Sequence, residues 1–111
     1  MDTVAWDDFE KLDIRTGTIA EVNDFPKARN PSYQLLIDFG PLGFKKSAAQ
    51  LVAGYTKEDL AGRQVIAVVN FRPKQIANFF SECLILGVYE SGNKVILIQP
   101  GQPVANGMKI G

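Results

Sequence analysis

The residues of this chain best suited to chemistry lie between positions 70 and 82. Two basic side chains there, Arg72 and Lys74, can meet phosphate oxygens. Three aromatic rings in the same stretch offer flat apolar surface on which a base can stack: Phe71, Phe79 and Phe80. The alternative is that these rings close one end of the fold as core and that the cations are only solvated. The stretch therefore predicts binding, with core packing as the competing interpretation.

Side chains for catalysis are scarce. The sequence has no histidine and one cysteine, Cys83, so the usual general base and the commonest nitrogen ligand of zinc are missing. It contains neither a glycine-rich phosphate loop nor a nucleophile elbow, and Asp7 with Asp8 is typical of the acidic first turn of a helix. We therefore expect no enzyme, no catalytic residues, no metal and no cofactor. Cys83 sits in an apolar run and is predicted to be a small buried hydrophobe.

Charge is distributed unevenly along a chain whose formal net charge is zero. Residues 1–24 carry seven acidic and two basic side chains, whereas residues 25–81 carry eight basic and three acidic ones. The basic middle, which includes Lys27, Arg29 and Lys45, indicates an anionic partner bound locally and in a salt-dependent way.

Most of the predicted elements are strands. Alternating or continuous apolar runs predict strands over residues 13–22, 33–39, 44–49, 65–69 and 83–89, with a further one at 95–98 after a Gly92-Asn93 turn. We expect a bulge or sharp bend at Gly17. A short helix is expected over residues 3–12, capped by Thr3 or Asp7. A second is expected over residues 51–61, with a capping box from Thr56 to Asp59 and Gly62 as its C-terminal cap.

This order predicts the fold. Three strands, a helix and two more strands, the first long and bent, are typical of a mainly β, five-stranded OB-fold Greek-key barrel, here with a short N-terminal helix and a helix between strands 3 and 4. The whole of 1–111 is expected to form one such domain. OB-folds bind ligands with the loops between strands 1 and 2 and between strands 4 and 5. In this chain those loops are residues 25–32 and 70–82, and both are basic.

The two ends of the chain carry apolar side chains that a free tail would not need. Trp6 and Phe9 near the start, and Val104, Met108 and Ile110 near the end, are expected to pack on the barrel or on a second subunit. No stretch approaches the roughly 18 apolar residues of a membrane span, so we expect no stable membrane insertion. The acidic first 24 residues are unlike an export leader, which predicts a cytoplasmic protein.

Several motifs together resemble one family. Residues 8–19 resemble the opening of the tRNA-binding domain found in methionyl-tRNA synthetase extensions, in the bacterial phenylalanyl-tRNA synthetase β chain and in the EMAP II cytokine. Residues 70–73, with Ile76 and Ser81, resemble its second motif. The combination of residues 8–18, 64–71, 99–100 and 106–111 is similar to a free-standing branch of this family, whose members are described as chaperones connected with protein export.

The resemblance implies an OB-fold homodimer in which residues 1–12 and 100–111 help to form the interface. It also implies two cargoes, which are tRNA and unfolded or exported polypeptide. Five positions match the family's RNA-binding motif: Lys45, Asn70, Arg72, Lys74 and Ser81. Ala49-Gln50 and Cys83-Leu84 stand where RNA-binding members carry Ser-Gly and Gly-Met, and these departures favour the chaperone branch.

The expected function is therefore an export-related chaperone that binds unfolded or precursor polypeptides, with Phe71, Phe79 and Phe80 as candidates for its apolar groove. The alternative is a tRNA-binding protein that uses the basic face of the barrel, to which Lys27 and Arg29 also belong. A third possibility is a dimerisation or scaffold module without either cargo.

Overall fold

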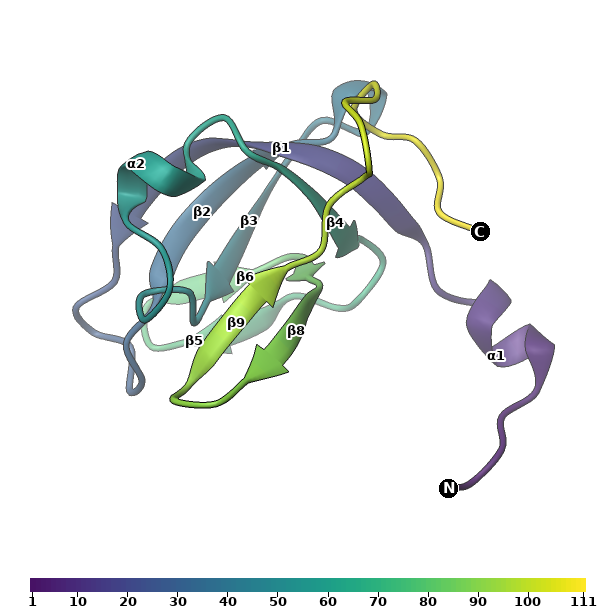
Figure 1. Cartoon of the computed structure of the whole chain (residues 1–111), viewed down its shortest axis with the longest axis horizontal. Coiled ribbons are helices and arrows are strands. Elements are labelled where there is room, and N and C mark those ends of the chain that lie inside the picture. The colour runs from purple at the N-terminus through teal and green to yellow at the C-terminus, as the bar shows by residue number, and fades with distance from the viewer.

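Five antiparallel strands form a nearly closed barrel in the computed structural model, which describes residues 1–111 (Figure 1). Their order in the sheet is β3-β2-β1-β4-β7. The bounds are β1 Ile14–Asp24, β2 Tyr33–Asp38, β3 Phe44–Ala49, β4 Gln64–Val68 and β7 Leu84–Ile85. The predicted OB-fold barrel is confirmed.

The long strand β1 curves so that it pairs on both sides. Its residues 14–18 pair with β4, and its residues 18–24 pair with β2. Of the bulge or sharp bend predicted at Gly17, the bulge is wrong, because Gly17 pairs in register with Val65 and the register shifts instead between Ile19 and Glu21. Gly17 is needed for another reason: a Cβ there would lie 2.7 Å from the ring of Phe39.

The core lies inside the barrel and follows the predicted alternation of β2. Tyr33, Leu35 and Ile37 are buried, and Phe39 beyond the strand has no exposed surface. Leu60 from the second helix and Val65 from β4 are equally buried. Since each side chain of this size contributes about 1.5–3 kcal/mol when fully buried, the barrel interior is the main source of stability.

Both α-helices are shorter than predicted. The first, α1, spans Trp6–Glu10, and its cap is neither Thr3 nor Asp7: the backbone N–H of Ala5 donates to the Asp8 carboxylate at 3.1 Å. At five and four residues, α1 and α2 both fall well below the length of an apolar helix that crosses a bilayer.

The second helix, α2, spans Lys57–Leu60, whereas a helix over 51–61 was predicted. The earlier residues form a turn, in which the Leu51 carbonyl accepts from the N–H groups of Gly54 and Tyr55, and Leu51 itself is buried. The capping box between Thr56 and Asp59 is confirmed, and Gly62 has the positive φ of 82° expected after a helix end. A short 3₁₀ turn, η1 Gly40–Leu42, links β2 to β3.

The predicted strand over residues 83–89 is split. β7 ends at Ile85, and Gly87–Glu90 forms β8, which pairs only with β9 Lys94–Leu97. Gly87 permits this, because a Cβ at that position would clash with the Val95 side chain. Gly92 and Asn93 at the turn have φ of 76° and 61°, so the predicted hairpin is confirmed.

The C-terminal segment lies back along β1. The N–H of Thr16 donates to the Met108 carbonyl at 3.0 Å, and the N–H of Ile110 donates to the Ile14 carbonyl at 2.8 Å. The C-terminal segment was predicted to pack on the barrel or on a second subunit, and its backbone lies on the barrel. This placement brings the C-terminus to the side of the barrel that carries α1 (Figure 1).

Candidate functional site

The stretch from 70 to 82, predicted as a loop, contains a small hairpin. β5 Lys74–Ile76 pairs with β6 Phe79–Ser81, and Ala77 at the tip has a positive φ of 52°. Because side chains alternate across a strand, the rings of Phe79 and Phe80 point to opposite faces. Phe79 is half-buried, whereas Phe80 and Phe71 are each 49% exposed.

Phe79 joins the two predicted binding loops. Its ring packs on buried Phe25 with centroids 5.4 Å apart, and the Lys46 ammonium lies 5.3 Å from its centroid. Phe25 opens the loop between β1 and β2. This contact therefore holds the two basic loops side by side at one end of the barrel.

The basic side chains of these loops are free of acidic partners. The chain has three ion pairs, Lys11–Asp8, Arg15–Asp13 and Lys57–Asp24, and none involves the predicted cations. Four of those cations are exposed: Lys27, Arg29, Arg72 and Lys74. Lys45 is half-buried on β3. An anion reaching this end of the barrel meets cations that form no ion pair within the chain.

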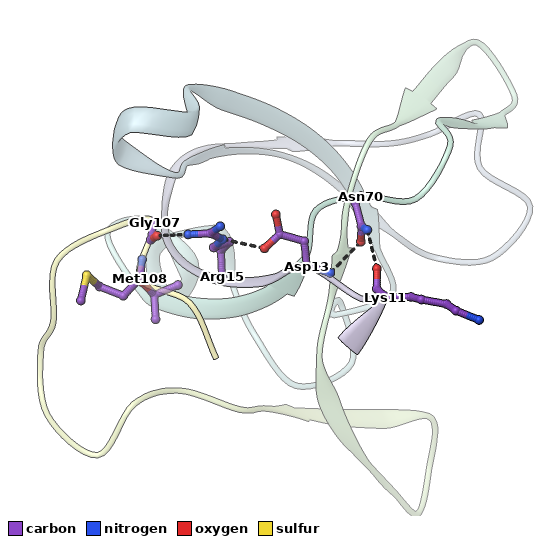
Figure 2. A network of polar contacts seen from close by, with 7 residues as sticks. Lys11, Asp13, Arg15, Asn70, Gly107 and Met108 are labelled. Carbon is purple, nitrogen blue, oxygen red and sulfur yellow. Dashed lines mark hydrogen bonds and ion pairs between the residues drawn. The ribbon is translucent and has the colours of Figure 1, made fainter. Parts of the chain in front are cut away.

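Asn70 and Ser81, the polar candidates, are engaged within the chain. Asn70 Oδ1 accepts from the Asp13 N–H at 2.8 Å, and its Nδ2 donates to the Lys11 carbonyl at 2.8 Å (Figure 2). Ser81 Oγ accepts from the N–H of Ala48 at 3.0 Å on β3. Both side chains fix the ends of the 70–82 stretch to the barrel.

Arg15 extends the same network towards the C-terminal segment. Its Nε donates to Asp13 Oδ1 at 2.6 Å and its Nη1 to the Gly107 carbonyl at 3.0 Å (Figure 2). Sequence reasoning did not assign Asp13 or Arg15 a role, although both lie in the first family motif. Their partners are too distant in sequence for a local pattern to indicate them.

The side chains predicted to form a subunit interface face solvent to different degrees. Trp6 is 87% exposed, Met108 54%, Phe9 45% and Val104 39%. Ile110 is partly buried. Large apolar side chains therefore remain uncovered on α1 and on the C-terminal segment, which lies against β1.

An apolar cleft was missed altogether. It lies between β3, β7 and the β8–β9 hairpin, and Leu84, half-exposed, is at its rim. The continuous apolar run from Cys83 to Val88 is the signal that could have indicated it, because one buried strand does not need every residue to be apolar. Cys83 itself is buried as predicted, and burial raises the pKa of its thiol to about 12.

A family model described as "Putative tRNA binding domain" matches residues 14–109. The chain belongs to this family of tRNA-binding domains. The match spans the whole barrel and most of the C-terminal segment bound to β1, so both basic loops lie inside the family unit.

Two solved chaperone structures are similar to this chain over nearly its whole length. The crystal structure of the chaperone CsaA from Bacillus anthracis is 45% identical, with a TM-score of 0.95 over 99% of this chain and 100% of that one. CsaA from Picrophilus torridus is 47% identical, with a TM-score of 0.91 over 98% of this chain and 100% of that one. The predicted resemblance to the free-standing chaperone branch is confirmed.

The curated relatives of this chain are much longer than the chain itself. Methionine–tRNA ligase of Thermococcus kodakarensis is 36% identical over 99% of this chain, but the match covers 14% of the ligase. The corresponding enzyme of Nanoarchaeum equitans is 37% identical, and 13% of it is covered. The chain thus spans about one seventh of the length of these ligases.

Proposed function

We propose that this chain is a cytoplasmic, homodimeric chaperone that binds unfolded or precursor polypeptides, including proteins destined for export. The observation that carries the proposal is the 45% and 47% identity to CsaA chaperones over their full lengths. Exposed apolar surface such as that of Leu84, which is 50% exposed, supports it, since a protein that holds unfolded chains must offer uncovered apolar side chains. The buried, unpaired Cys83 is compatible with a reducing compartment.

The second candidate function is tRNA binding. It is favoured by the two basic loops, which the Phe25–Phe79 contact holds together and which carry exposed cations without acidic partners. Binding of this kind releases counterions, so the affinity falls steeply as salt concentration rises. Apolar binding of a polypeptide does not share that dependence.

Titration of the purified protein with tRNA and with an unfolded export precursor, each at low and near-physiological salt, separates the two. The chaperone function predicts precursor binding that persists at the higher salt. If no precursor binds, and tRNA binds tightly at low salt but weakly at near-physiological salt, only the RNA-binding function remains.

The double variant Arg72→Ala, Lys74→Ala tests the RNA surface within the same experiment. If tRNA binds there, the variant reduces the slope of log affinity against log salt by about 2 and leaves precursor binding unchanged. Lys94→Ala is the matched control, because Lys94 is an exposed lysine outside both loops. An equal effect of Lys94→Ala would show that tRNA binds to diffuse positive charge.

A further inference from the structure

The barrel has an open seam between β3 and β7. No ladder joins these two strands, and the last backbone hydrogen bond across the seam runs from the N–H of Glu82 to the Lys46 carbonyl at 2.7 Å. Beyond that point the strands enclose a cleft of about 420 Å³ that extends under the β8–β9 hairpin.

The cleft is suited to an apolar occupant. Nine of its eleven lining residues are hydrophobic, and none carries a charge. Leu51 and Leu97 are buried in it, whereas Leu84 and Tyr89 are 50% and 91% exposed. A nucleic acid would bring phosphates to a surface without cations, so the lining disfavours it.

Backbone groups on both sides of the seam face the cleft without partners. On β7, Leu86 donates to the Ile66 carbonyl, so Ile85, one residue away, points its N–H and C=O away from β4 and towards the seam. On β3, Ala48 faces the same way: its N–H already donates to Ser81 Oγ, and its carbonyl is the group left for a partner. Both residues line the cleft. Free strand edges beside an apolar groove are the features by which proteins add an extended peptide as a strand.

We propose that this seam is the polypeptide-binding site and that its occupant is an extended, uncharged, apolar segment. Its backbone hydrogen-bonds to the edges at Ala48 and Ile85, and its apolar side chains enter the cleft beside Leu84. This inference rests on the proposed chaperone function and locates it in the seam, away from the phenylalanines of the 70–82 stretch.

A second copy of this chain is a weaker candidate for the cleft. The exposed apolar arm that a copy can offer consists of α1 and the non-helical residues 1–5 before it. The backbone groups of α1 are directed along its own axis, so α1 cannot pair with a strand edge. Residues 1–5 can pair, but they would bring the charged Asp2 to a cleft whose lining carries no charge. The cleft therefore favours an extended segment without charge.

The test uses fluorescence anisotropy with a labelled nine-residue peptide of alternating valine and serine, and with the same peptide N-methylated at alternate residues. Methylation removes donors and leaves the side chains in place. We expect the methylated peptide to bind at least about tenfold more weakly. Leu84→Glu, at the half-exposed rim, is expected to weaken the unmethylated peptide by about tenfold or more.

Two variants are the controls. Val88→Glu adds the same charge at an exposed valine that does not line the cleft, and Phe80→Ser changes the outer face of the β5–β6 hairpin. Both are expected to bind the peptide like the unmodified chain. Circular dichroism and sedimentation of each variant establish that fold and oligomeric state are retained.

Several results would overturn the proposal. Equal binding of both peptides would exclude strand addition, and loss of binding in Phe80→Ser but not in Leu84→Glu would place the site on the hairpin. Dissociation of a dimer by Leu84→Glu would make the seam a subunit interface. In each case the chaperone function still stands if an unfolded precursor binds the unmodified chain. If no unfolded polypeptide binds the unmodified chain, the chaperone function itself is wrong.

Discussion

At the scale of single residues, Asn70 connects three parts of the molecule. Asn70 itself follows β4. Its side-chain amide is hydrogen-bonded to the Lys11 carbonyl, which follows α1, and to the Asp13 N–H, which precedes β1. The family resemblance places this residue in an RNA-binding motif, and the structure shows that both ends of its side chain are already hydrogen-bonded inside the chain.

We predict that Asn70→Ala lowers the free energy of unfolding by about 1–2 kcal/mol, because two hydrogen bonds are lost. Asn70→Asp keeps the acceptor for the Asp13 N–H but sets a carboxylate oxygen against the Lys11 carbonyl and adds a negative charge beside Asp13, so its loss should be at least as large. Urea unfolding measures both. An unchanged urea midpoint in Asn70→Ala, together with weaker tRNA binding, would instead place this side chain in contact with RNA.

The burial of a side chain could be predicted from the sequence more readily than its hydrogen-bond partners. The burial of Cys83 follows from its apolar neighbours, and it is confirmed. The bonds of Asn70 to Asp13 and of Arg15 to Gly107 join positions 57 and 92 residues apart, which no local pattern reveals. Side-chain hydrogen bonds of this range become visible only once the strands are placed.

At the scale of secondary structure, α2 depends on its N-terminal cap. The N–H of Thr56 donates to the Asp59 carboxylate at 2.9 Å, and the N–H of Asp59 donates to Thr56 Oγ1 at 3.2 Å. The hydrogen bond from the Thr56 N–H to the carboxylate, with the Thr56 side chain adding to it, lowers the pKa of Asp59 below its usual value. The unfolded chain therefore binds a proton at this position more readily than the folded chain does.

The sign of the pH dependence follows. The contribution of Asp59 is fully present above its unfolded pKa of about 4 and is lost as the pH falls through the lower, folded value. We predict that the stability advantage of the unmodified chain over Asp59→Asn shrinks as the pH falls below about 4. Urea unfolding at several pH values measures this, and Glu58→Gln is the control, since it removes an adjacent carboxylate outside the capping box. A constant difference across this range would contradict the assignment.

The elements that the sequence predicted correctly carry their signal within a few residues. The alternation of β2, the Gly92-Asn93 turn and the Thr56-Asp59 cap are examples. The errors came from contacts between elements. The helix over 51–61 is shortened because Leu51 enters the core. The strand over 83–89 is split because its pairing changes at Leu86, whose N–H donates to Ile66 on β4 and whose carbonyl accepts from Ile98 beyond β9.

At the scale of the whole molecule, one side of the barrel gathers uncovered apolar surface. α1 precedes Ile14, and the C-terminal segment is hydrogen-bonded to the same residue through Ile110, so both lie next to the start of β1 (Figure 1). Trp6 and Met108 on these segments are mostly exposed. A two-fold arrangement that brings this side of one copy against the same side of another would cover both.

We therefore predict that Trp6→Ser converts a homodimer into monomers. A buried tryptophan at an interface is typically worth about 2 kcal/mol or more, and a two-fold dimer loses two copies, so the dissociation constant should rise by two to three orders of magnitude. Sedimentation equilibrium over a range of concentrations measures it. Tyr89→Ser is the matched control, since Tyr89 is 91% exposed on β8, outside this surface. If Tyr89→Ser gives monomers and Trp6→Ser leaves the dimer intact, the subunit interface lies at the β8–β9 hairpin and the adjacent seam, and not at α1.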